Sequence, residues 1–161
     1  FVLESANKKL QQIKRSNPSA AGLVVASSVA HAKQIRRILV EQFNESVMLV
    51  TYQQKHATQD INSFRKGSCN WVISVGMISE GTDIPRLQVC CYLSRITTEL
   101  YFRQVLGRIL RITTSIDERA WLYVLAEPNL VKFSNRLASE IPESNVILKE
   151  KIVDKYQHIK T

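Results

Sequence analysis

The sequence contains no long apolar run, no visible secretion signal and few potential metal ligands. None of its apolar runs approaches the roughly 20 residues that a membrane-spanning helix needs, and no signal peptide is seen. We therefore expect a cytoplasmic protein with no membrane partner. The three histidines and three cysteines form no cluster with metal-ligand spacing, so no metal site is predicted.

Two further patterns are missing. No C-x-x-C pair is present, and the neighbours Cys90 and Cys91 would point to opposite faces of a strand. We therefore interpret the cysteines as small, buried apolar residues of a protein in a reducing compartment. The chain also lacks G-x-x-x-x-G-K-[ST], the loop whose backbone N–H groups cradle nucleotide phosphates. A nucleotide site of that kind is therefore excluded within this chain.

Positive charge is abundant. The net charge is +8 and the pI about 9.6, which favours a polyanionic partner, most plausibly nucleic acid. The alternative is that basic residues are spread over solvated faces, as at Lys8–Lys9 and Arg36–Arg37.

Hydrophobic patterning predicts a three-layer α/β fold. Short continuous apolar runs, typical of parallel strands covered on both faces, occupy Gly22–Ala26, Val47–Thr51, Trp71–Val75, Gln88–Leu93 and Ala120–Leu125. Helical patterns lie between them, one through Val29 and Leu39, a second through Ala57 and Phe64, and a third over 97–111. This alternation predicts a mostly parallel sheet flanked by helices.

The two ends of the chain differ from this pattern. The spacing of Leu3, Ala6, Leu10 and Ile13 predicts an amphipathic helix, so residues 1–20 are expected to be a helical extension. Residues 21–140 would form the main domain, with a further helix after Pro128. Residues 141–161 would be a tail or the start of another module.

Polar residues follow two of the predicted strands, where ligands bind in open parallel sheets. Ser27 and Ser28 follow the first strand and would offer hydroxyl and N–H groups to a phosphate at a helix N-terminus. The simpler interpretation is that Ser28 is an N-cap and His31 a first-turn residue. The loop 76–85 contains Gly81 and two carboxylates, which suit a ribose hydroxyl, although it could be an ordinary loop.

Gln104, Arg108 and Arg111 fall at i, i+4 and i+7 of the predicted helix over 97–111 and would share one side of it. Two permanent cations on one side require an anion, and phosphate is the usual one. Because the chain has no phosphate cradle of its own, the cradle is expected to belong to a neighbouring domain.

These segments together resemble a known family. Leu23–Ser28, Ser74–Pro85 and Gln104–Arg111 are similar to motifs IV, V and VI of the C-terminal RecA-like domain of superfamily-two DNA and RNA helicases. The pattern Q-x-x-G-R-x-x-R of motif VI is matched in full. Within the superfamily, the chain looks most like bacterial or phage helicases related to type III restriction and Rad25/Ssl2-like helicases.

The resemblance implies an ATP-driven helicase or translocase that uses ATP and Mg²⁺, both held mainly by an N-terminal RecA-like domain. Arg108 and Arg111 would be arginine fingers, and Gln104 would position the γ-phosphate or the attacking water. The nucleotide would be contacted by Gly81, Asp83 and Glu80. Nucleic-acid phosphates would be held by Ser27, Ser28, Val75 and Gly76.

The sequence departs from the RNA-helicase pattern at two positions. Glu80 and Val105 stand where many RNA-helicase relatives carry basic residues, which favours DNA over RNA as the partner. The isolated chain is expected to be inactive as an ATPase. The alternative function is a non-catalytic nucleic-acid-binding module derived from a helicase domain.

Overall fold

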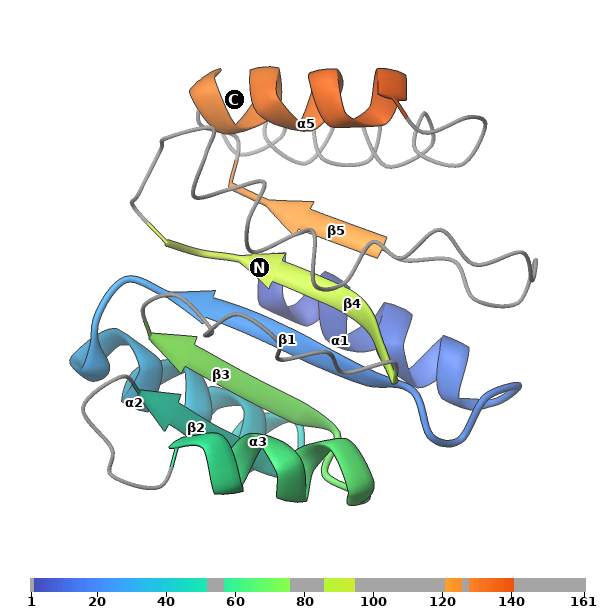
Figure 1. The fold of residues 1–161 in the computed structure, drawn as a ribbon, viewed down its shortest axis with the longest axis vertical. Coiled ribbons are helices and arrows are strands. Elements are labelled where there is room, and N and C mark those ends of the chain that lie inside the picture. The colour runs from blue at the N-terminus through green and yellow to red at the C-terminus, as the bar shows by residue number, and fades with distance from the viewer. Residues whose placement is uncertain (1, 52–56, 76–85, 95–120, 126–127, 141–161) are drawn as a thin grey trace.

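The computed structural model describes residues 2–51, 57–75, 86–94, 121–125 and 128–140. Within these residues, five strands form one parallel sheet in the order β2-β3-β1-β4-β5 (Figure 1). The strands are β1 (Ala21–Ala26), β2 (Val47–Thr51), β3 (Trp71–Val75), β4 (Leu87–Tyr92) and β5 (Trp121–Val124). Each predicted run ends within one residue of the observed strand.

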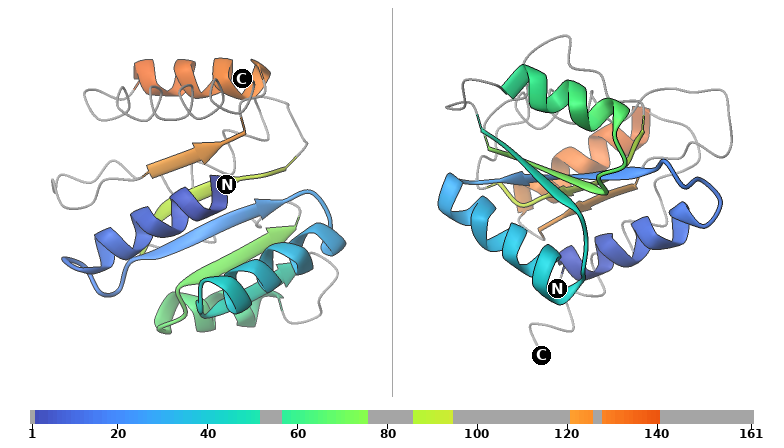
Figure 2. Two further views of the ribbon diagram at one scale, coloured as in Figure 1. Left: turned by 180° about the vertical axis from the view of Figure 1, so that it is seen from behind. Right: turned by 90° about the horizontal axis from the view of Figure 1, so that it is seen from below.

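Helices cover both faces of the sheet, which confirms the predicted three-layer α/β architecture (Figure 2). On one face lie α1 (Val2–Lys14) and α2 (Val29–Arg37), the latter continued by the π-helical turn η1 (Ile38–Gln42). On the other lie α3 (Ala57–Lys66) and α5 (Pro128–Glu140). Every residue of β1, β3 and β4 is buried, which explains why these strands are mostly apolar on both faces rather than alternating.

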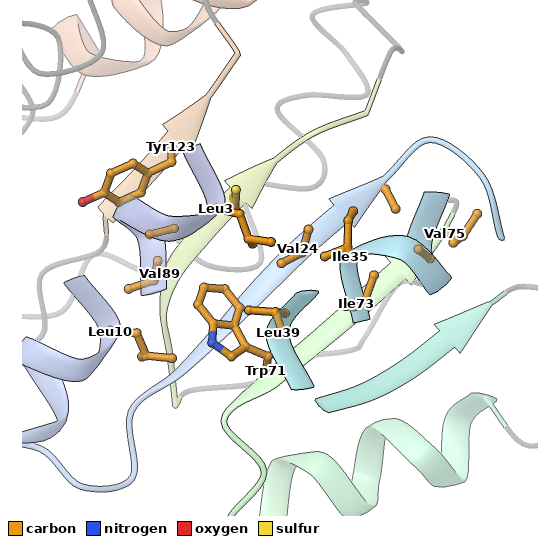
Figure 3. Close-up of a cluster of buried hydrophobic side chains, with 14 of the residues drawn as sticks. Leu3, Leu10, Val24, Ile35, Leu39, Trp71, Ile73, Val75, Val89 and Tyr123 are labelled. Atoms are coloured by element: carbon orange, nitrogen blue, oxygen red, sulfur yellow. The ribbon is translucent and has the colours of Figure 1, made fainter. Parts of the chain in front are cut away.

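The amphipathic helix α1 packs closely on the sheet. Leu3, Ala6 and Leu10 are buried in the same cluster as residues of α2, β3 and β4 (Figure 3). Trp71 of β3 donates a hydrogen bond from Nε1 to Oδ1 of Asn7 in α1, across 3.0 Å. This bond links the helix to the start of β3. The domain boundaries at residues 20 and 140 stay predictions.

The position of the Trp71 indole requires a glycine at residue 22, the register partner of Trp71 in β1. A Cβ at Gly22 would lie 2.6 Å from Cε3 and 2.7 Å from Cη2 of Trp71. Only glycine admits the ring at this distance, since carbon atoms of different side chains pack at about 4 Å. Gly22 therefore serves close packing rather than a turn.

Arg86, just before β4, is buried without a carboxylate partner among the described residues. Its guanidinium donates to four backbone carbonyls, at 3.0 Å to Ser19, 2.6 Å to Phe64, 2.6 Å to Gly67 and 2.5 Å to Cys69. These acceptors belong to the turn before β1, the last turn of α3 and the segment between α3 and β3. One side chain thus joins three segments at the edge of the sheet where the strands begin.

Candidate nucleic-acid interface

The ends of β1 and β3 lie side by side at the carboxyl edge of the sheet, the edge at which the parallel strands end. Ala26 and Val75 are register partners, and Thr51 at the end of β2 is the next partner of Val75. Ser27 and Ser28 follow Ala26, and Gly76 follows Val75. The structure thus brings together the strand ends from which two of the predicted phosphate-binding segments leave.

Ser28 is the N-cap of α2, as the simpler interpretation predicted. Its extended backbone (φ −154, ψ 168) positions Oγ to accept a hydrogen bond from the His31 N–H, at 3.1 Å. The N–H groups of Val29 and Ala30, one and two residues into the helix, have no carbonyl partner within it. Capping and phosphate binding are compatible here because the Ser28 side chain is exposed and its hydroxyl proton is not used by the cap.

Ser27 is more constrained than Ser28. Its backbone N–H donates to Nδ1 of His31 at 3.1 Å, and its hydroxyl donates to the carbonyl of Leu93 at 3.3 Å. Phosphate oxygens only accept hydrogen bonds, so Ser28 and the first N–H groups of α2 are the better-placed donors. The role of His31 in holding Ser27 could not be inferred from the sequence, because it depends on the direction of one imidazole nitrogen.

Positive charge lines the exposed side of α2. Lys33, Arg36 and Arg37 are exposed, and α2 contains no acidic residue. None of the three forms an ion pair with another described residue, unlike Lys8 of α1, which lies 3.4 Å from Glu4. The helix therefore combines a positive dipole end at Ser28 with free cations further along.

The remaining predicted site residues lie outside the described part of the chain. They are Gly76, Glu80, Gly81 and Asp83 from the loop after β3, and Gln104, Arg108 and Arg111 from the predicted helix over 97–111. Val75 is described and buried, so only its backbone is available to a ligand. The roles of all these residues stay predictions.

The described residues contain no group of three His, Cys, Asp or Glu side chains able to hold a metal ion. None of the described helices is long and apolar enough to cross a membrane. Cys90 and Cys91 are free thiols on opposite faces of β4, one in each core cluster, as the sequence predicted. Burial raises the pKa of Cys91 to about 12 and raises that of Cys90 as well.

Comparison with known sequences gives a consistent result. The family model "Helicase conserved C-terminal domain" matches residues 5–113. An uncharacterized protein of Mycobacterium leprae is 32% identical over 139 residues, which cover 86% of this chain and 23% of that protein. An uncharacterized protein of Mycobacterium tuberculosis is 31% identical over 146 residues, covering 91% and 24%. The chain thus spans about a quarter of the length of these curated relatives.

Solved structures share the fold at low sequence identity. Domain 2 of the DEAD-box helicase Mss116p, bound to an RNA duplex, superposes with a TM-score of 0.65 at 14% identity, covering 95% of this chain and 63% of that one. The Hef helicase domain of Pyrococcus furiosus gives 0.60 at 16% identity, covering 84% and 28%. The C-terminal part of the Fun30 ATPase domain gives 0.59 at 14% identity, covering 96% and 53%.

The family match confirms the resemblance to the C-terminal domain of helicases, and the solved structures confirm the fold. The narrower likeness to type III restriction and Rad25/Ssl2-like helicases stays a prediction. The family match covers most of the chain and includes all three motif segments, and the parallel sheet has the RecA-like form of the similar structures. The chain belongs to the helicase conserved C-terminal domain family.

Proposed function

We propose that this chain is the second motor domain of an ATP-dependent nucleic-acid helicase or translocase. The observation that carries the proposal is the family match over residues 5–113, which includes Gln104, Arg108 and Arg111 as well as both strand-end segments. The chain lacks a phosphate cradle of its own. ATP and Mg²⁺ would therefore be held mainly by an N-terminal RecA-like domain that faces this one.

Arg108 and Arg111 would reach the triphosphate across the cleft between the two domains. As arginine fingers they would stabilise the charge that develops on the transferring phosphoryl group, an effect of roughly a thousandfold or more on turnover. Gln104 would orient the γ-phosphate or the attacking water. The chain by itself would then have little or no ATPase activity, because the ATP-binding site that the arginine fingers complete belongs to the other domain.

The loop after β3 would contact the nucleotide through Gly81, Glu80 and Asp83, with Asp83 at the ribose. Both ends of this loop are fixed in the described structure. Val75 is paired with Ala26 and Thr51 in the sheet, and Arg86 is held by four carbonyls.

Nucleic-acid phosphates would be held at the carboxyl edge by Ser27, Ser28, Val75 and Gly76. The exposed Ser28 hydroxyl and the first N–H groups of α2 support this role best, because they are donors at a positive helix end. Such contacts do not read the base sequence. ATP-dependent closure of the cleft would change the grip on the phosphates and move the protein along a strand.

DNA is the proposed partner, on the strength of Glu80 and Val105. One of the similar structures is a helicase domain bound to an RNA duplex, so both nucleic acids belong in the test. ATP hydrolysis should be measured in a polypeptide that joins this chain to its N-terminal RecA-like domain, with single-stranded DNA, duplex DNA and RNA as activators.

The decisive variant is Arg108→Ala, compared with Lys132→Ala on the exposed side of α5 as a control of equal charge change. We expect Arg108→Ala to lower the stimulated turnover by roughly a thousandfold and Lys132→Ala to leave it unchanged. Near-normal turnover of Arg108→Ala would overturn the arginine-finger assignment. Binding of nucleic acid without any stimulated hydrolysis would favour the non-catalytic module instead.

A further inference from the structure

One side of α2 continues the candidate phosphate site away from the carboxyl edge. Ala30, Lys33 and Arg37 are all exposed and lie at i, i+3 and i+7, so they share one side of the helix. The opposite side is buried through Ala32, Ile35 and the following Leu39. At about 1.5 Å per residue, this exposed side extends about 13 Å from Ser28 to Arg37.

We propose that a nucleic-acid strand held at the N-terminus of α2 continues along this exposed side, with its backbone phosphates facing Lys33 and Arg37. The inference rests on the nucleic-acid-binding role proposed above and adds a direction to it. The strand would leave the carboxyl edge over the face of the sheet that carries α1 and α2. It would not be confined to the strand ends.

Charge complementarity supports this occupant. α2 has no acidic residue, and its exposed cations lack an ion-pair partner among the residues the structure describes. The nearest acidic side chain in sequence is Glu41, one turn beyond Arg37 and exposed. Basic residues in the last turn also suit the helix dipole, but that effect does not require Lys33 in the middle of the helix. A polyanion interacts with both positions and with the helix N-terminus.

The test compares two double variants of the chain that remove the same charge from opposite faces. The first is Lys33→Gln with Arg37→Gln. The matched control is Lys66→Gln with Lys132→Gln, at exposed positions of α3 and α5. Binding of a short fluorescein-labelled single strand of oligo-dT is followed by anisotropy over a series of KCl concentrations, and thermal melting confirms that each variant is folded.

We expect the α2 double variant to bind roughly tenfold more weakly than the control, since each exposed ionic contact is worth about two- to fivefold. The slope of log K against log[KCl] should also fall by about 0.7 for each phosphate contact removed from a single strand. Equal affinity and equal slope in the two double variants would overturn the inference, because general electrostatics would then explain the loss.

A Ser28→Asp variant separates this inference from the proposed function. If Ser28→Asp abolishes binding while the α2 double variant matches its control, the helix N-terminus binds phosphate and only the path along α2 is overturned. If the unaltered chain binds neither oligo-dT nor an RNA strand of equal length, the nucleic-acid role and the path along α2 fail together.

Discussion

Arg86 contacts Phe64 in two ways, through a hydrogen bond to its carbonyl and through its ring. The Nη1 atom of Arg86 donates to the Phe64 carbonyl at 2.6 Å, and its guanidinium carbon lies 4.7 Å from the centre of the Phe64 ring. Phe64 stands near the end of α3, where its carbonyl also accepts the Gly67 N–H at 3.2 Å and where the helix dipole favours a positive charge. Burial lowers the pKa of Arg86, yet a guanidinium keeps its charge in a protein.

Replacing Arg86 should therefore destabilise the domain strongly. We expect Arg86→Leu to lower the free energy of unfolding by about 3 kcal/mol or more, since each buried acceptor left without a donor costs roughly 1–3 kcal/mol. Arg86→Lys should lose less, because it keeps the charge but not the planar fork of donors. Urea unfolding followed by tryptophan fluorescence measures both. A Leu variant as stable as the unaltered chain would contradict this account.

Gly22→Ala should also be destabilising, by about 1–3 kcal/mol, as expected for overpacking in a close-packed core. The added methyl would meet the Trp71 ring. Combining Gly22→Ala with Trp71→Phe tests the cause, since the smaller ring leaves room for the methyl. The double variant should lose less stability than the sum of the two single variants; simple additivity would show that the two sites do not share this contact.

At Ser28, stability and nucleic-acid binding should respond to different substitutions. Ser28→Ala removes the acceptor for the His31 N–H and should cost about 1 kcal/mol. Ser28→Asp keeps a capping oxygen but adds a negative charge, so the fold should remain stable while binding of a phosphate backbone is lost. Ser28→Asn keeps the cap without the charge and should retain binding. If binding simply followed stability across the three variants, Ser28 would be a cap alone.

Alkaline pH should lower the stability of the fold because a buried thiol and a buried phenol ionise less readily than they do in the unfolded chain. Burial raises the pKa of Cys91 from 9.0 and that of Tyr123 from 10.0, both to about 12. The unfolded chain thus loses these protons first, and the free energy of unfolding should decrease as the pH rises from about 9 towards 12. Lys14 acts in the opposite direction, since burial lowers its pKa.

Cys91→Ala tests this account, because it removes the Cys91 thiol together with the part of the Tyr123 pKa shift that the Cys91 charge causes. The variant should lose stability less steeply over the same pH range, by up to about 1.4 kcal/mol per pH unit relative to the unaltered chain. Lys14 is common to both proteins, so its effect cancels in the comparison. Parallel pH profiles of melting temperature for the two proteins would show that Cys91 does not remain protonated in the fold.

The sequence was sufficient for the strands, the described helices and the family, because these depend on local patterns. Continuous apolar runs such as Trp71–Val75 reveal strands covered on both faces, and the serine before Val29 marks the start of α2. The motif segments are likewise continuous in the chain. Residues 97–111, predicted as a helix carrying Gln104, Arg108 and Arg111, lie outside the described residues, so that prediction remains to be tested.

Contacts between distant segments could be known only from the tertiary structure. Arg86 looks like an ordinary basic residue after a proline, and its four acceptors are 17 to 67 residues away. The same holds for Asn7, which meets Trp71 64 residues later, and for His31, which holds Ser27 through one ring nitrogen. Residue types and their order determine which elements form, whereas side-chain partners depend on how those elements pack, and no local pattern encodes that geometry.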